Sequence, residues 1–192
     1  ESTEQFYKWD RGNFDAYNNL RDITKMAEEA EKAGLTAYGA VAKFFRAFYF
    51  YNITMHFGDI PYSEALKGEV GDYKAPAYDE QKAVFVGILK ELEEANAILE
   101  AEKTIIAGDL IYKGDVAKWQ KLVNSFRLKV LITLSKKTGD NDLSVQSAFS
   151  SIANNEPLFQ SNADNAQLVW LDQQSNRYPQ FNSSSFGSGM YI

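Results

Sequence analysis

Hydrophobic residues recur at steps of three and four positions along five segments of the chain, which is the period of an amphipathic α-helix. These segments are residues 14–33, 37–57, 80–100, 116–137 and 143–153. A short strand is predicted at residues 167–171, where the sequence reads QLVWL. The pattern therefore predicts an all-α fold with four long helices, a short fifth helix and long irregular loops.

The segment at residues 37–57 differs from the others because apolar residues cover most of its circumference. A helix of this kind is stable only where other elements surround it, so we predict that it is the central helix of the fold. Within it, Phe44, Phe48, Tyr51 and Met55 have helical spacing. We interpret them as a buried stripe rather than as a ligand surface.

Polar residues and glycines mark the predicted helix ends. Gly34 occupies the place of a glycine that ends a helix. The residues expected to act as N-caps are Asn13, Thr36, Asp79, Asp115 and Asp142. Because almost nothing separates the first two helices, they are expected to form a tight antiparallel hairpin, and the next two form a second. Paired hairpins are typical of tetratricopeptide-like arrays, although the consensus W-x2-L-G-x2-Y is not in register.

The helical period ends after residue 157. Residues 158–192 are rich in Asn, Gln, Ser and Asp, with isolated aromatic residues between them. We expect a single domain over residues 1–192, in which residues 14–157 form a helical scaffold and residues 158–192 a loop-rich extension. Loops on a rigid scaffold are common places for ligand binding.

Acidic residues on the predicted helix at residues 80–100 raise the question of carboxylate chemistry. Glu91, Glu93 and Glu94 are predicted to form a solvated face. Glycosidases use two carboxylates at a defined separation, but acidic side chains on a helix surface are too common to indicate such a pair. A carboxylate-based hydrolase is therefore the least favoured function class.

Composition and motifs exclude several other classes. The net charge is −6 without a cluster of Lys and Arg, which argues against a nucleic-acid partner. The chain has no Cys and one histidine, His56, which is expected to be buried or at the rim of the core, so thiolate and His-rich metal sites are excluded. The motifs G-x-x-x-x-G-K-[ST], G-x-G-x-x-G, H-E-x-x-H and G-x-S-x-G are missing. We expect no enzymatic activity, no cofactor and no metal.

The most apolar segment is not predicted to span a membrane, because Lys43, Arg46 and other polar residues interrupt it. The chain begins with Glu1 and ends on apolar residues that follow Gly189. We expect a fragment or processed part of a longer protein, with any signal peptide or lipid-anchor Cys upstream.

Four blocks of sequence, in their order and spacing, resemble the SusD/RagB family of outer-membrane nutrient-binding lipoproteins of Bacteroidetes. They are YNNLRD at 17–22; RAF at 46–48 with FGDIPYSEAL at 57–66; ILKELEEA at 88–95; and GDLIY at 108–112 with KWQKL at 118–122 and NSFRL at 124–128. The likeness covers residues 14–138 well and the remainder loosely.

The resemblance implies tetratricopeptide-like helical hairpins with long loops that build a ligand surface. It also implies a non-enzymatic protein at the cell surface, attached to the outer membrane only through a lipid anchor. Its expected partners are a SusC-like TonB-dependent transporter and an oligosaccharide or, in some branches, a peptide. The motif residues look like scaffold rather than site; they are Asp59, Pro61, Tyr62, Asp109, Trp119, Asn124 and Arg127.

Glycan-binding members of this family use aromatic platforms with flanking amides and acids. The matching candidates in the extension are Trp170, Asn176, Tyr178 and Phe181, with Trp9 near the start of the chain. Each could instead pack against the helices. The alternative function is a protein-interaction scaffold that binds a peptide or protein partner and no small ligand.

Overall fold

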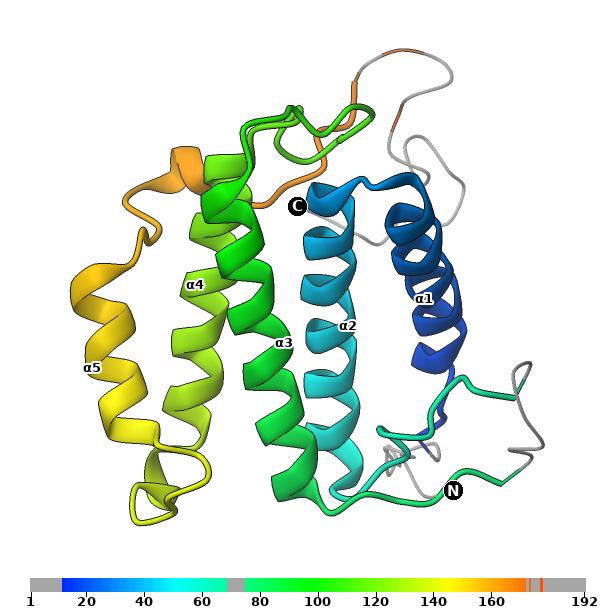
Figure 1. The fold of residues 1–192 in the computed structure, drawn as a ribbon, viewed down its shortest axis with the longest axis vertical. Coiled ribbons are helices and arrows are strands. Elements are labelled where there is room, and N and C mark those ends of the chain that lie inside the picture. Colours follow the sequence, from blue (N-terminus) through cyan, green and yellow to red (C-terminus); the bar gives the residue numbers. More distant parts are fainter. Residues whose placement is uncertain (1–11, 69–74, 172, 174–176, 178–192) are drawn as a thin grey trace, which may run out of the picture.

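The computed structural model describes residues 12–68 and 75–171, together with residues 173 and 177. Five α-helices lie side by side in this part of the chain, and Figure 1 shows α2 between α1 and α3. The helices are α1 (Ala16–Ala33), α2 (Thr36–Phe57), α3 (Gln81–Ala101), α4 (Val116–Thr133) and α5 (Val145–Asn155), with short 3-10 turns η1 (Ser135–Lys137) and η2 (Asn162–Asp164). The all-α prediction is confirmed.

Helix α2 is the central element, as its apolar sequence predicted, because it packs against α1, α3 and α4. Phe44 and Tyr51 are buried, and their rings lie 5.7 and 5.4 Å from the ring of Phe126 on α4. The predicted stripe is wrong at its other two positions, since Phe48 and Met55 are exposed. The three neighbouring helices leave this part of the α2 surface uncovered.

The first two helices form the predicted antiparallel hairpin (Figure 1). Gly34 ends α1 in the left-handed conformation, with φ of 66°, and the N–H of Leu35 donates to the carbonyl of Ala30 at 2.8 Å. A side chain at this backbone angle would be strained, which explains the glycine. Helices α3 and α4 also run antiparallel and form the second hairpin (Figure 1).

Only one of the predicted N-caps is confirmed: Asp115 accepts a hydrogen bond from the backbone N–H of Lys118 at 3.2 Å. The residues Asn13, Thr36, Asp79 and Asp142 do not cap a helix. Thr36 instead lies in the first turn of α2, where its hydroxyl donates to Glu102 at 2.7 Å. Asp142 forms an ion pair with Lys82 at 2.6 Å.

The two ends of the connection from α2 to α3 are held together by backbone hydrogen bonds. Ile60 and Asp79 form an antiparallel bridge, with hydrogen bonds of 3.2 and 2.9 Å between their backbones. The carboxylate of Asp79 then accepts the N–H groups of Tyr62 and Ser63. The first N–H of α3, on Gln81, donates to Asp59 at 2.8 Å, so a residue from the preceding turn caps this helix.

The second long connection, between α3 and α4, is organised by Asp109. Its carboxylate accepts three backbone N–H groups and the indole N–H of Trp119, the latter at 2.8 Å. Helix α4 is shorter than predicted because η1 replaces its last turn. Beyond α5, Asp164 binds Lys121 at 3.0 Å and fixes the segment that follows to α4.

The start of the extension crosses the end of the helical layer at which α2 begins (Figure 1). Residues 167–171 do not form the predicted strand, and the described ranges contain no strand. Their run of apolar side chains is exposed and has no neighbouring strand to pair with. None of the helices in the described residues combines the length and apolar character needed to cross a bilayer.

Candidate functional site

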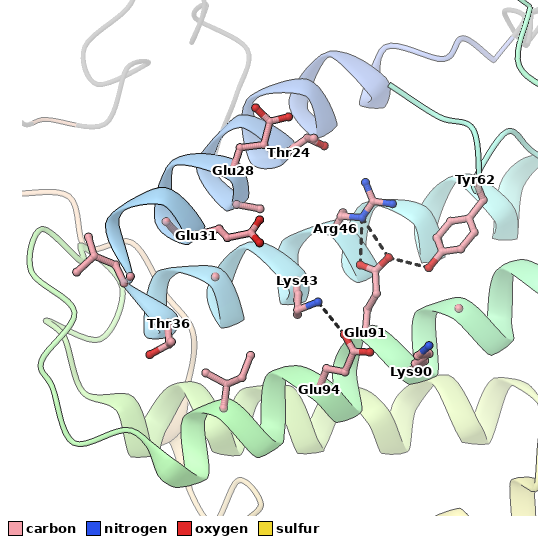
Figure 2. A pocket seen from close by; sticks show the side chains of 17 residues that line it. Thr24, Glu28, Glu31, Thr36, Lys43, Arg46, Tyr62, Lys90, Glu91 and Glu94 are labelled. Atoms are coloured by element: carbon pink, nitrogen blue, oxygen red, sulfur yellow. Dashed lines mark hydrogen bonds and ion pairs between the residues drawn. The ribbon is translucent and has the colours of Figure 1, made fainter. Parts of the chain in front are cut away.

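A cleft of about 840 Å³ lies between α1 and α3, with α2 as its floor (Figure 2). Its volume falls within the range of small-molecule sites, roughly 300–1,000 Å³. Charged and polar residues on all three helices face it. The residues that carry its chemistry are Thr24, Glu28, Glu31, Lys43, Arg46, Tyr62, Lys90, Glu91 and Glu94.

Arg46 lies at the centre of the floor and is held from two sides. Its Nε donates to both carboxylate oxygens of Glu91, at 3.1 and 3.2 Å. Its guanidinium also lies over the rings of Phe50 and Tyr62, 5.0 and 5.8 Å from their centroids. An arginine held by a carboxylate and by aromatic faces keeps a fixed orientation.

Tyr62 closes one end of the cleft and donates its hydroxyl to Glu91 at 2.7 Å (Figure 2). Burial and then the Glu91 carboxylate raise the pKa of Tyr62 well above its ordinary value, so the phenol stays protonated as a donor. The ring crosses α3 at Gly87, where a Cβ would overlap it. The glycine is therefore required for Tyr62 to reach Glu91.

A second ion pair joins Lys43 to Glu94 at 2.7 Å, and the hydrogen bond from Lys43 lowers the pKa of Glu94. The prediction of a solvated acidic face on α3 is thus wrong for Glu91 alone, because the Glu94 side chain is 43% exposed. The side chain of Glu91 is only 15% exposed, whereas that of Glu93 is 72% exposed and fits the prediction.

Helix α1 supplies the opposite wall with Thr24, Glu28 and Glu31 (Figure 2). The hydroxyl oxygen of Thr24 is buried and makes no hydrogen bond with a described residue. The cleft therefore presents hydrogen-bond donors on its floor and acceptors on its walls. Within the described ranges, no group of acidic or histidine side chains could hold a metal ion.

The residues of this cleft were not predicted as a site. Lys43 and Arg46 were noticed only as interruptions of an apolar helix, and the acids on α3 only as a solvated face. One sequence signal was available, because both pairs have a spacing of three residues. On antiparallel helices this spacing places Lys43 opposite Glu94 and Arg46 opposite Glu91, as the structure shows.

The predicted ligand residues are mostly outside the part of the chain that can be described. Trp170 is described and is 46% exposed, beyond the end of the helical layer. Asn176, Tyr178, Phe181 and Trp9 lie outside the described residues. That the five candidates form one site therefore stays a prediction.

A smaller, apolar hollow of about 420 Å³ lies close to Trp170, and Leu168 forms part of its wall. The rest of its lining comes from α1, α2 and the connection before α4, with Tyr38, Phe45, Leu110 and Trp119 among the contributors. It has few polar groups to orient a ligand. His56 lines neither cavity and is exposed, so of its two expected positions, buried or at the rim of the core, the buried one is wrong.

The motif residues act as scaffold where the structure describes them. Trp119 is buried against Phe44, and its indole N–H is bonded to Asp109. Asn124 is fully buried and accepts a hydrogen bond from Arg127 at 3.1 Å, while its amide donates to Asn96. These contacts join α3 to α4 and support the interpretation of the motif as structural.

The helical fold and its motif-bearing connections define a class of protein. Residues 3–188 match the model of the SusD-like family described as starch-binding and associating with the outer membrane. The chain therefore belongs to the SusD-like family. No curated protein matches the chain.

Several solved structures share this fold. A SusD homologue from Bacteroides fragilis is 55% identical, with a TM-score of 0.84, over 95% of this chain and 39% of its own length. A putative outer-membrane protein from Bacteroides vulgatus, described as probably involved in nutrient binding, is 55% identical with a TM-score of 0.85, over 95% of this chain and 40% of its own. A chitin-binding protein is 28% identical, with a TM-score of 0.68, over 79% of this chain and 32% of its own.

The chain thus spans about 40% of the length of its 55%-identical relatives. The tetratricopeptide-like hairpins expected from the resemblance agree with these helical neighbours.

Proposed function

We propose that this chain is part of a non-enzymatic nutrient-binding protein of the bacterial cell surface, which captures an oligosaccharide for import. The observation that carries the proposal is the family match over residues 3–188, together with the 55% identity to a protein described as probably involved in nutrient binding. The starch-binding and chitin-binding descriptions of the family and of one relative favour a glycan ligand.

We further propose that the protein is held at the outer membrane by a lipid anchor and delivers its ligand to a SusC-like TonB-dependent transporter. The support for this step is the family's described association with the outer membrane. Expression of the longer protein with an affinity tag in its native host, followed by mild solubilisation, tests it. Co-purification of a large β-barrel protein with the tagged protein supports the partnership. Recovery of the tagged protein without such a partner contradicts it.

Ligand binding is tested by calorimetric titration of the chain with maltoheptaose and chitohexaose. Aromatic rings in the extension are the proposed contacts, so Trp170→Ala and Tyr178→Ala are expected to weaken binding at least about tenfold, or 1.4 kcal/mol. Phe14→Ala is the matched control, because this exposed ring lies at the opposite end of α1. Equal affinities for all variants would contradict the proposed site.

The alternative is a scaffold that binds a peptide or protein and no small ligand. Paired helical hairpins support this function in general, because stacked hairpins present extended binding surfaces. The same titration distinguishes the nutrient-binding function from the scaffold function. A scaffold would bind no saccharide but would still co-purify with a protein partner. Release of reducing sugar from either oligosaccharide would contradict the non-enzymatic assignment.

A further inference from the structure

The cleft between α1 and α3 is formed by the helical scaffold itself rather than by the extension. Both helices pack on α2, but they make no contact with each other, so the space above α2 stays open along its first half. Figure 2 shows charged side chains from all three helices converging there. A cavity lined by fixed elements is better suited to orient a ligand than one lined by loops.

Arg46 has donors besides the Nε that binds Glu91. Both of its hydrogen bonds to Glu91 start from Nε, while Nη1 and Nη2 lie on the side of the guanidinium facing away from Glu91 (Figure 2). Among the described residues, Arg46 donates to Glu91 from Nε, and the Tyr62 phenol is the other polar group beside its guanidinium. The Arg46 side chain is only 22% exposed. The two terminal nitrogens of its planar guanidinium therefore face a partly desolvated cleft in a fixed orientation.

The charge balance of the cleft favours a neutral ligand. Glu91 neutralises Arg46, and Glu94 neutralises Lys43, at N–O distances of 3.1 and 2.7 Å. The remaining charges that line it are those of Glu28, Glu31 and Lys90, of which Glu28 is paired with Lys25. With these pairs discounted, one carboxylate, Glu31, and one ammonium, Lys90, remain in the lining, so the cleft has no charge excess that would favour an anion. A ligand whose hydroxyls both donate and accept would satisfy the floor and the walls together.

The floor also has room for a ring-shaped ligand. Gly39 lies on α2 facing the cleft, and a Cβ built at this position would have no atom within 4 Å. Its backbone angles do not require glycine, and glycine in a helix interior is destabilising by about 1 kcal/mol relative to alanine. Neither conformation nor packing explains this glycine, whereas a close approach by a ligand does.

We propose that this cleft is a second saccharide-binding site, which takes a neutral sugar unit with Nη1 and Nη2 of Arg46 as its central donors. This inference rests on the proposed function, because it adds a site inside the scaffold to the one proposed on the extension. The acceptor opposite Arg46 on α1 is Glu31. Lys43, Glu94 and Tyr62 hold the floor in place.

The steric test is Gly39→Leu, which places a bulky side chain in the cleft one helical turn before Lys43. Ala83→Leu is the matched control, because Ala83 is an exposed position on α3 that does not line the cleft. Titration of the chain with maltoheptaose and chitohexaose is expected to show two binding events. Gly39→Leu is expected to remove one of them or weaken it at least about tenfold, while Trp170→Ala affects the other and Ala83→Leu affects neither.

A second variant tests the donors. Arg46→Met alone would leave Glu91 as an unpaired, partly buried charge, and removal of Glu91 would leave the Tyr62 hydroxyl without its acceptor. The triple variant Arg46→Met, Glu91→Leu and Tyr62→Phe therefore replaces the whole network with apolar groups. It is expected to keep the thermal midpoint of unfolding near that of the parent and to lose the same binding event as Gly39→Leu.

The outcomes separate the two proposals. If the parent binds saccharide and Gly39→Leu binds it with unchanged stoichiometry and affinity, the cleft is not a sugar site and the proposed function stands. If the parent binds neither probe, both proposals are overturned. The proposal of a neutral sugar is wrong under a third outcome. In that outcome the parent binds trigalacturonate or trialanine but no neutral saccharide in the cleft, and Gly39→Leu abolishes this binding.

Discussion

Asp109 organises a whole connection with one side chain. It accepts the N–H groups of Ile111, Tyr112 and Gly114 and the indole of Trp119, so it fixes the loop before α4 and the buried ring on α4 at the same time. The Asp109 carboxylate caps no helix; its partners are the N–H groups of its own loop and the indole of Trp119 on α4. Its loss would free four donors in a partly buried place.

Asp109→Asn is expected to lower the free energy of unfolding by about 2–3 kcal/mol, because an amide cannot accept from donors on both of its heteroatoms. Chemical denaturation followed by circular dichroism measures this change. Asp115→Asn is the control, since asparagine also serves as an N-cap and the cost there should be within about 0.5 kcal/mol. A similar small cost at both positions would contradict the role given to Asp109.

The same carboxylate predicts a dependence of stability on pH. Burial acts to raise the pKa of Asp109, but the hydrogen bonds from Gly114, Trp119 and its other donors outweigh it and hold the pKa below its ordinary value. The stabilisation is therefore complete above the ordinary pKa, about 3.9, and is lost as pH falls through the lower pKa of the folded state.

Denaturation curves of the parent between about pH 5 and pH 2.5 should accordingly show a steeper loss of stability than those of Asp109→Asn. The difference between the two proteins should be largest at pH 5 and should shrink toward the acid end. Parallel curves over the whole range would show that Asp109 titrates as in an unfolded chain.

At the scale of elements, the pairing of α2 with α3 combines apolar packing with a register of ion pairs. Arg46 meets Glu91 and Lys43 meets Glu94, while Tyr62 lies across Gly87 and joins the same network. A shift of one helical turn would place each cation away from its carboxylate. The network thus specifies how the two helical hairpins face each other.

Two glycines on these helices give a matched pair of tests. Gly87→Ala introduces a Cβ that overlaps the Tyr62 ring, so the ring must move and its hydrogen bond to Glu91 is broken. We expect a net destabilisation of about 1–2 kcal/mol. The pKa of Tyr62, read from its ultraviolet absorbance, should also fall back toward the ordinary value as the burial and the Glu91 contact that raise it are lost.

Gly39→Ala is the counterpart, because the position is open and the helix gains from alanine. Its free energy of unfolding should rise by about 0.5–1 kcal/mol. Destabilisation by Gly39→Ala, or stabilisation by Gly87→Ala, would mean that the two glycine environments are not as described.

The sequence predicted the helices well and their ends poorly, for a physical reason. Periodicity is local and strong, so the positions of α1 to α5 and the central place of α2 followed from it. Capping is predicted from neighbours along the chain, yet α3 is capped by Asp59, which is more than twenty residues away. Asp79, the local candidate, binds the preceding turn instead.

The candidate cleft escaped prediction for the same reason. Its charged residues belong to separate helices, and each set on its own has the composition of an ordinary solvated face. Only the complementary spacing of Lys43 and Arg46 with Glu91 and Glu94 carried the information. The absence of a strand at residues 167–171 shows the limit of local pattern as well, because a strand needs a partner along its edge.

At the scale of the whole molecule, apolar side chains gather at the end of the helical layer near the apolar hollow. Leu168, Val169, Trp170 and Leu171 are consecutive and exposed, and Leu110 close to them is 76% exposed. A run of four exposed apolar residues is an interaction or aggregation surface. This chain also spans about 40% of the length of its 55%-identical relatives.

The isolated 192-residue chain is therefore expected to self-associate as its concentration rises. Replacing Leu168, Val169 and Leu171 with Ser should shift it toward monomer in sedimentation velocity runs at matched concentrations, with little change in helix content. Replacing the equally exposed Ile132 with Ser is the control, because this residue lies apart on α4. If both variants associate as strongly as the parent, the apolar run at residues 168–171 is not the self-association surface.

The backbone bridge between Ile60 and Asp79 has a practical consequence. It closes the α2–α3 connection at its root; Tyr62 and Ala65 just beyond it still pack against the core, whereas Lys67 and Gly68 are exposed. An epitope tag or a fluorophore-bearing cysteine could be spliced in there without remodelling the body of the protein. The fold thus offers a position at which a label would leave the helices unchanged.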